Sequence, residues 1–177
     1  MFAFLFKHLR FISLLCVIVV MVIIFIFSAQ SAEESSELSG QFVEIIIKIF
    51  IPDYNNLSLL QQQEINDKIG FVIRKTAHFT EFSFLGFFLI LHLSTIRHIF
   101  GKIKNKTFFL FCISWFLGTF YAVTDEIHQS FVSGRYSSIK DVLIDSSGVL
   151  FGITILIIFL PIFIQKLKNK YTINISI

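Results

Sequence analysis

The chain has 177 residues, of which 55% are hydrophobic and 24 are phenylalanine. Soluble domains are roughly 45–50% apolar, so this composition argues against an ordinary soluble enzyme and favours an integral membrane protein. The formal net charge is +3, and no surface pattern of basic residues interleaved with aromatics is evident. A nucleic-acid partner is therefore not expected.

Four apolar runs approach or reach the roughly 17 to 25 residues that a membrane-crossing helix needs. We predict an all-α fold, an integral membrane four-helix bundle that forms a single domain over residues 1–177. The predicted spans are residues 11–27, 71–93, 108–125 and 142–161, with an outer segment at 28–70 and a cytoplasmic loop at 94–107. The first run follows positive residues, as in a signal peptide, but it is long and no clear cleavage pattern follows it, so we expect a retained span.

The orientation follows from the lysines and arginines in the short connecting regions, which favour the cytoplasm. The basic residues that set it are Lys7, Arg10, Arg97, Lys102, Lys104, Lys106, Lys166, Lys168 and Lys170. Both termini are therefore predicted to be cytoplasmic. The acidic segment 28–70 and the mixed stretch 124–141 are predicted to lie outside.

The outer segment contains an amphipathic pattern before the second span. Gln41, Glu44 and Lys48 are spaced i, i+3 and i+7, which places them on one helical face and suits a helix lying in the membrane interface. Pro52 ends this helix, and a second amphipathic stretch at 58–69 leads into the second span. These interfacial helices either cap the bundle or form a lid over a site.

The second span carries a polar stripe. Arg74, His78 and Glu81 follow i, i+4, i+7 spacing and share one face, with Lys75 at its edge. If hydrocarbon begins near Phe71, Glu81 lies about 15 Å deep at 1.5 Å per residue. Ionisable residues at such depth are disfavoured unless they face a cavity, a partner or a substrate.

The third span ends in a second polar string. Asp125 shares a face with Gln129 and with His128, and adjacent carboxylates on a helix cannot point the same way. We expect one of Asp125 and Glu126 to face inward toward the basic groups or histidine of the second span. The other turns toward Arg135 in the outer loop, where Gly134 permits a tight turn.

The fourth span repeats the stripe. Asp141, Asp145, Gly148 and Gly152 lie within about 60° of one another on the helix. The aspartates predict a polar opening at the outer end of this span, and the glycines predict a close helix contact deeper in the membrane. The ionisable residues of three spans are thus expected to converge on one half of the bilayer.

Several interpretations of this convergence remain open. A buried ion-pair network that fixes helix register would explain it without a ligand. Carboxylate–histidine pairs at i, i+3, His78 with Glu81 and Asp125 with His128, resemble metal-binding pairs of helix bundles. The nearby cations instead favour an anion held by basic side chains, so no metal or other cofactor is expected. The two cysteines, Cys16 and Cys112, are expected to be buried hydrophobes.

The polar motifs resemble those of the VanZ-like membrane proteins of bacteria. The resemblance rests on FSAQS, RKTAHFTEF, DEIHQSFVSGR and DVLIDSSGVLFG, covers about residues 11–159, and departs from many relatives at Ser133, where they have proline. The matching signature positions are Lys75, His78, Glu81, Asp125, Glu126, Gln129, Gly134, Arg135, Asp141 and Gly148. The resemblance implies a multi-pass protein of the bacterial cytoplasmic membrane and cell envelope, with a link to resistance to the glycopeptide antibiotic teicoplanin and no firmly attached catalytic chemistry.

Three functions follow as hypotheses, and the oligomeric state is not predicted. The first is binding or modifying an anionic amphiphile at the outer leaflet: a membrane lipid, a lipid-linked cell-wall precursor or a lipoglycopeptide. Its expected ligand contacts are Arg74, Lys75, Glu126, Gln129, Arg135, Asp141 and Asp145. The second is a hydrolase or transferase acting on a lipid or phosphate ester, with Glu81 or Asp125 as general base and His78 as acid. The third, an ion path, lacks polar residues in the inner half of the spans.

Overall fold

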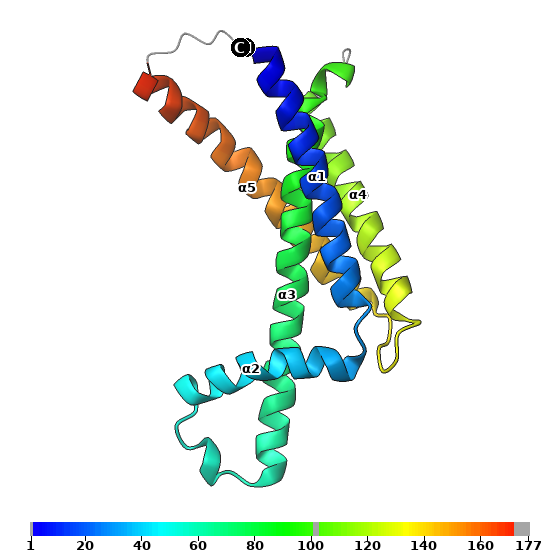
Figure 1. Cartoon of the computed structure of the whole chain (residues 1–177), viewed down its shortest axis with the longest axis vertical. Coiled ribbons are helices and arrows are strands. Elements are labelled where there is room, and N and C mark those ends of the chain that lie inside the picture. The colour runs from blue at the N-terminus through cyan, green and yellow to red at the C-terminus, as the bar shows by residue number, and fades with distance from the viewer. Residues whose placement is uncertain (1, 101–102, 172–177) are drawn as a thin grey trace.

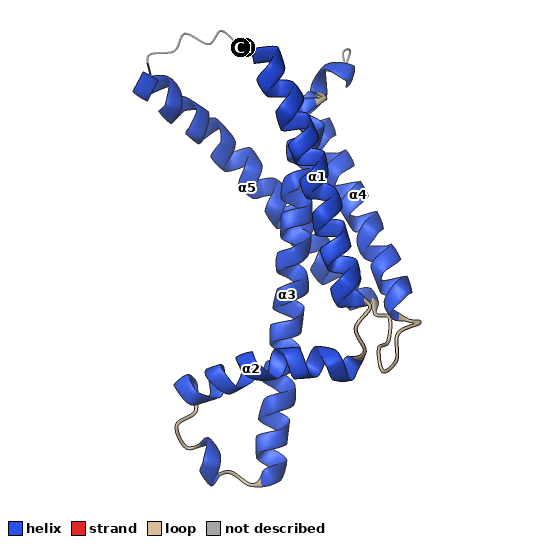
Figure 2. Ribbon diagram, in the orientation of Figure 1, coloured by secondary structure: helices blue, strands red, loops and turns tan. Residues whose placement is uncertain are grey.

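The computed structural model describes residues 2–100 and 103–171, and these residues are helical apart from short connections (Figure 1, Figure 2). The elements are α1 (Phe2–Ser28), α2 (Ala32–Phe50), η1 (Tyr54–Asn56), α3 (Leu59–Thr95), η2 (Arg97–Phe100), α4 (Lys106–Gln129) and α5 (Ile139–Tyr171). The predicted all-α fold is confirmed. Lys102, one of the residues used for the orientation, lies outside the described residues.

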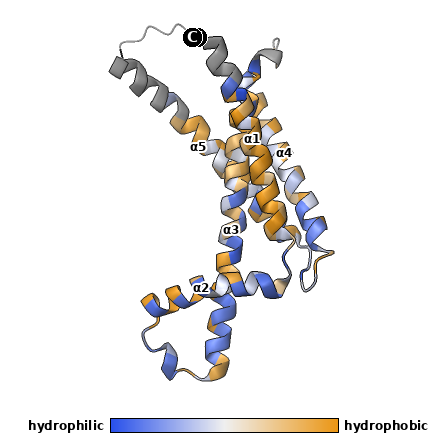
Figure 3. Cartoon of the chain, in the orientation of Figure 1, coloured by the Kyte–Doolittle hydropathy of each residue, from blue (hydrophilic) through white to orange (hydrophobic). Residues whose placement is uncertain are grey.

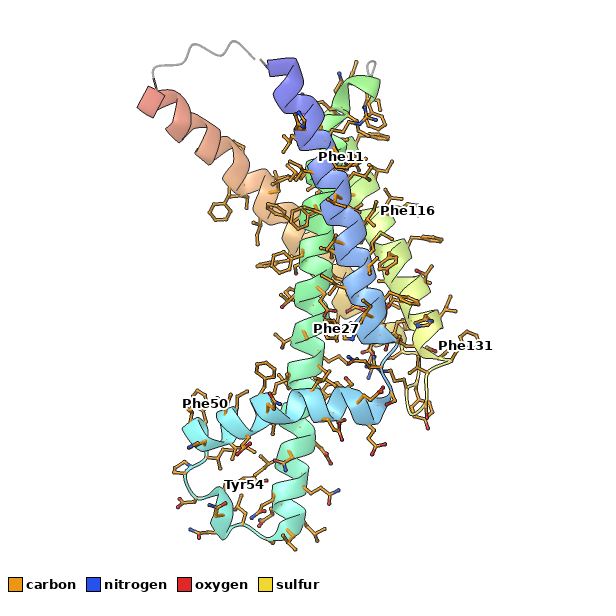
Figure 4. The ribbon with its side chains drawn as sticks, in the orientation of Figure 1. Phe11, Phe27, Phe50, Tyr54, Phe116 and Phe131 are labelled. Carbon is orange, nitrogen blue, oxygen red and sulfur yellow. The ribbon has the colours of Figure 1, made fainter. Side chains whose placement is uncertain are left out.

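Four of these helices, α1, α3, α4 and α5, are long and apolar enough to cross a membrane. They contain the four predicted spans. Many large apolar side chains on their outer faces are exposed, among them Phe11, Ile18, Phe116 and Phe120. Figure 3 shows apolar residues along α1, α4 and α5, and Figure 4 shows Phe11 and Phe116 directed away from the bundle. A monomeric soluble protein rarely exposes so much apolar surface, so these faces are suited to lipid.

Helix α3 is longer than the span predicted within it. It begins at Leu59 with Ser58 as its N-cap, and the Ser58 and Gln61 side chains form a capping box. The amphipathic stretch expected at 58–69 is therefore the first part of one continuous helix. No proline interrupts the sequence between that stretch and the span, and one glycine, Gly70, is not enough to end a helix.

Helix α2 lies across α3 at the end of the bundle where the α1–α2 and α4–α5 connections meet, which we call the loop end (Figure 1). Its buried face contains Ser39, Val43 and Ile47, while Glu44 and Lys48 are exposed. The predicted amphipathic helix is thus confirmed. It starts with a capping box between Ser31 and Glu34, and hydrogen bonds from the Ser31 backbone and side chain lower the pKa of Glu34.

The closest helix contact in the bundle joins α3 and α5 through glycines. A Cβ added to Gly148 would lie 2.5 Å from the Phe79 carbonyl oxygen, and one added to Gly152 would overlap the Ser83 carbonyl oxygen. The close contact predicted from these glycines is confirmed. Beside it lies the apolar core, which includes the fully buried Phe82.

We predict that Gly152→Ala destabilises the protein, because its methyl group would force α5 away from the α3 backbone. Overpacking of this kind costs about 1–3 kcal/mol. The measurement is the thermal midpoint of the purified protein in detergent. Gly40→Ala in α2 is the control, since a Cβ there meets nothing within 4 Å. Equal midpoints for the two variants would contradict the tight contact.

Candidate functional site

Polar side chains from four helices gather inside the loop end of the bundle. We call the following five residues the polar cluster: His78 and Glu81 from α3, Asp125 and Gln129 from α4, and Asp145 from α5. Ser28, the last residue of α1, joins them by hydrogen bonding. The convergence predicted from the three polar spans is therefore confirmed.

Asp125 is the inward-facing carboxylate of the adjacent pair on α4. Its Oδ2 accepts a hydrogen bond of 2.8 Å from the Ser28 hydroxyl and one of 2.9 Å from the Gln129 amide. The same amide nitrogen lies 3.2 Å from the Ser28 oxygen. These three buried groups tie the end of α1 to α4, and they fix the orientation of the carboxylate.

Glu126, the second carboxylate of that pair, turns toward the α4–α5 loop as expected, but its partner differs. Its Oε2 accepts a 2.8 Å hydrogen bond from the backbone N–H of Ser138, just before α5. The expected partner was Arg135. A fixed backbone donor at the start of α5 satisfies the buried carboxylate at less entropic cost than a long arginine side chain.

His78 and Glu81 face each other on α3 within the polar cluster. His78 Nδ1 lies 3.7 Å from Glu81 Oε2, and both side chains are mostly buried. Neither of these two atoms has a hydrogen-bond partner among the described residues. The stripe predicted on α3 thus places an imidazole and a carboxylate side by side, with unused hydrogen-bonding capacity.

Of the three basic residues expected to meet one ligand, Lys75 is separated by the fold from Arg74 and Arg135. Lys75 forms an ion pair of 2.5 Å with Asp141 and lies 5.5 Å from the centre of the Phe71 ring. Arg74 Nη1 instead approaches the hydroxyls of Ser36 and Ser39 in α2, at 3.5 and 3.4 Å. Lys75 is therefore neutralised within the protein, whereas Arg74 contacts uncharged groups.

Arg135 lies in the α4–α5 loop and points back to the end of α1. Gly134 adopts φ +73°, which confirms the predicted tight turn, and Arg135 Nη2 donates a 3.3 Å hydrogen bond to the Phe27 carbonyl. The Ala32 N–H donates to the Ser133 carbonyl at 3.1 Å, so the two connections of the loop end are joined. Burial lowers the pKa of Arg135, and nearby Asp125 opposes that shift. An arginine nevertheless stays charged.

Beside the polar cluster is a cavity of about 220 Å³, which we call the arginine cavity. Its wall consists of Phe27, Gln30, Ser35, Leu38, Ser39, Phe42, Ile73, Arg74, Ala77, His78, Glu81 and Arg135. Figure 4 shows Phe27 at the end of α1, close to the α2–α3 crossing. A larger cavity of about 710 Å³ lies between α2 and the first part of α3, and Arg74 borders both. The arginine cavity thus combines two cations, an imidazole and a carboxylate with apolar walls.

His128 does not join the polar cluster as a partner of Asp125. Its ring stacks on Phe25 with 4.7 Å between centroids. Asp125 and His128 therefore do not form the pair that was considered as a metal site. Instead, donor atoms of His78, Asp125 and Asp145 lie within 4.8 Å of one another.

Sequence reasoning missed the serines that support the site. Ser28 binds Asp125, Ser36 and Ser39 contact Arg74, and the Ser138 amide binds Glu126. For Ser28, the sequence offered one indication of a role, its place in the FSAQS motif. Ser36, Ser39 and Ser138 lie on segments whose position relative to the spans depends on the loops, so the sequence did not indicate their contacts.

Comparisons with known proteins agree with the motif pattern. A sequence profile described as VanZ/LLP1 matches residues 11–160. The searches of curated proteins and of solved structures found no match.

We predict that Ser28→Ala destabilises the protein by about 1–3 kcal/mol, because it leaves buried Asp125 with one donor fewer. The measurement is the thermal midpoint in detergent. Ser147→Ala is the matched control, since the Ser147 hydroxyl is exposed and donates to the Ile144 carbonyl within its own helix. A Ser28→Ala midpoint no lower than that of the control would contradict a structural role for this contact.

Proposed function

The chain belongs to the VanZ/LLP1 family, and from this premise we propose that it binds the anionic headgroup of a membrane amphiphile in the arginine cavity. The observation that carries the proposal is the presence of two guanidinium groups, those of Arg74 and Arg135, in the wall of one cavity. Neither forms an ion pair with a carboxylate of the described residues.

The hydrogen bonding of the two arginines leaves them able to take an anion. Arg74 makes two contacts of 3.4 and 3.5 Å to hydroxyls, and Arg135 makes one of 3.3 Å to a carbonyl. Each guanidinium has five N–H donors, and its planar fork suits the oxygens of a phosphate or carboxylate. A half-buried cation that is hydrogen-bonded to neutral groups is stabilised strongly when an anion binds to it.

The rest of the cavity suits the apolar part of an amphiphile. Phe27, Leu38, Phe42 and Ile73 line it, and Leu38 and Phe42 are also exposed on the surface of α2. A volume of about 220 Å³ suits a headgroup, so the acyl or prenyl chain would extend along the apolar outer faces of the helices. Lys75 and Asp141 neutralise each other, which narrows the proposed anion contacts to Arg74 and Arg135.

The proposed ligands are membrane lipids, lipid-linked cell-wall precursors and lipoglycopeptides, taken from the outer leaflet of a bacterial cytoplasmic membrane. The lipoglycopeptide would connect the protein to tolerance of teicoplanin-type antibiotics. The support for these finer proposals is the motif resemblance and the distribution of basic residues in the connecting regions.

A second candidate function is hydrolysis or group transfer on a lipid or phosphate ester. His78 and Glu81 line the same cavity as the arginines, and their facing Nδ1 and Oε2 atoms lack hydrogen-bond partners in the described structure. In this function Glu81 or Asp125 acts as the general base and His78 as the acid, while the arginines hold the anion.

We predict that Arg74→Gln and Arg135→Gln each weaken binding of dihexanoyl phosphatidic acid by about 10–100-fold. This corresponds to the loss of hydrogen bonds to a charged group, about 1.5–3 kcal/mol. Binding is measured on the purified protein in detergent, with dihexanoyl phosphatidylcholine as the uncharged comparison. Lys68→Gln is the control variant, because Lys68 is exposed and its partner among the described residues is Glu64 on the same helix.

Unchanged affinity in both arginine variants, or equal binding of the two lipids by the unaltered protein, would refute the anion site. Release of inorganic phosphate from the phosphatidic acid would favour the second function. In that case Glu81→Gln should stop phosphate release while binding is retained.

We also predict that the loop end faces the cell exterior. With Cys16 and Cys112 replaced by serine, a membrane-impermeant maleimide added to intact cells should label Glu34→Cys and not Lys104→Cys. Labelling after membrane disruption checks that both sites can react. The reverse pattern in intact cells would place the arginine cavity on the cytoplasmic side.

A further inference from the structure

Three side chains of types that commonly bind metals come from three different helices and meet inside the polar cluster. They are His78 of α3, Asp125 of α4 and Asp145 of α5, and one donor atom from each lies within 4.8 Å of the other two. We propose that these residues bind a divalent transition-metal ion, zinc or manganese, next to the arginine cavity. The proposal does not depend on the identity of any amphiphile.

Asp145 is the strongest single indication of a cation-binding site. Its side chain is buried, with the residue 2% exposed, yet it forms no hydrogen bond or ion pair with any described residue. Aspartate is almost never fully buried without a partner, because an isolated buried carboxylate is costly to ionise. A nearby carboxylate, Asp125, adds repulsion. A bound cation would satisfy both groups at once.

One oxygen of Asp125 is held by hydrogen bonds and the other is not, as in many carboxylates that bind a metal. Its Oδ2 is held by Ser28 and Gln129, whereas its Oδ1 accepts no hydrogen bond from the described residues. Ligating carboxylates are commonly fixed in this way by hydrogen bonds from outside the metal site. Oδ1 is the oxygen left for a metal.

His78 is oriented in a way that suits a metal ligand. Its Nδ1 faces Glu81 Oε2 at 3.7 Å, so Nε2 is the nitrogen available on the other side of the ring. A metal-bound histidine usually donates its second N–H to a carboxylate, which fixes the tautomer. A slight shortening of the Nδ1–Oε2 separation would form that hydrogen bond and would make Glu81 a positioning residue.

The donor set selects the class of metal. One imidazole and two carboxylates suit zinc or manganese, whereas magnesium and calcium prefer oxygen ligands throughout. Zinc binds such donors at about 2.0–2.2 Å, which places tetrahedral donors about 3.4 Å apart. Side-chain rotations that shorten the separations of up to 4.8 Å by about 1.4 Å would bring the three donors to this spacing. Three protein ligands leave a position for water or for an anion from the cavity.

In the sequence, the basic residues near the cluster were a reason not to expect a metal. In the structure, these residues have other direct partners. Lys75 is paired with Asp141, Arg74 reaches the serines of α2, and Arg135 is bonded to the Phe27 carbonyl. None of these side chains forms an ion pair with Asp125 or Asp145 in the described structure. Asp125 and Asp145 are therefore free of direct ion pairs with the described residues, which leaves their oxygens able to bind a metal ion.

The test is metal content of the full-length protein, purified in detergent without an oligohistidine tag. The protein is stripped with chelator, equilibrated with zinc or manganese, separated from free metal and analysed by mass spectrometry of the elements. We expect one ion per chain, lost in His78→Gln and Asp145→Asn. Glu126→Gln is the matched control and should keep its ion, because Glu126 is equally buried on α4 but bonded to the Ser138 amide.

Glu81→Gln should keep the stoichiometry and weaken metal affinity by about 10–100-fold, as expected for a residue that orients a ligand. Asp145→Cys should retain zinc and lose manganese, because a thiolate favours the softer ion. The unaltered stripped protein should also gain thermal stability when metal is added. No stoichiometric ion and no thermal shift in the unaltered protein, or full metal content in a folded Asp145→Asn, would overturn the proposal. Both outcomes are independent of lipid binding.

Discussion

The burial of carboxylates among membrane-spanning helices is the constraint on which the loop end of this protein depends. Asp125 and Glu126 are each 4% exposed, and Asp145 is 2% exposed. A buried charge must be paired or hydrogen-bonded, and the demand is greatest where lipid replaces water around the helices. Oδ2 of Asp125 accepts hydrogen bonds from a hydroxyl and an amide, and Oε2 of Glu126 accepts one from a backbone N–H. These bonds explain why the end of α1 and the start of α5 are held against α4.

The glycine contact between α3 and α5 sets the geometry of the polar cluster. Gly148 packs against the carbonyl of Phe79, which follows His78 directly. Asp145 lies three residues before Gly148 on the same helical face. A larger side chain at Gly148 or Gly152 would separate the two backbones and would draw Asp145 away from His78. Packing in the apolar core and the chemistry of the polar cluster are therefore linked through one helix interface.

The helical periodicity of the sequence predicted which residues share a face. It did not predict which hydrogen-bond or ion-pair partner each residue has. The stripes on α3 and α5, the glycine contact and the positive φ of Gly134 follow from spacing and residue type alone. Adjacent helical residues differ by 100° in direction, so Lys75 and Arg74 were bound to point apart. Their partners could not be predicted, because those depend on where α2 crosses α3 and where α5 begins. The Ser138 amide as partner of Glu126 depended on the loop conformation, which no pattern in the sequence encodes.

Charges of opposite sign lie close together at the loop end. The guanidinium groups of Arg74 and Arg135 line the arginine cavity, the carboxylates of Asp125 and Asp145 belong to the polar cluster, and His78 belongs to both. In a medium of low dielectric constant, each group of like charges is unfavourable without counter-charge. An anion in the cavity and a cation in the polar cluster would each be stabilised by the other, because a bound metal ion is the largest local charge in such a site. The two proposed occupants are therefore expected to bind cooperatively, although each can be measured alone.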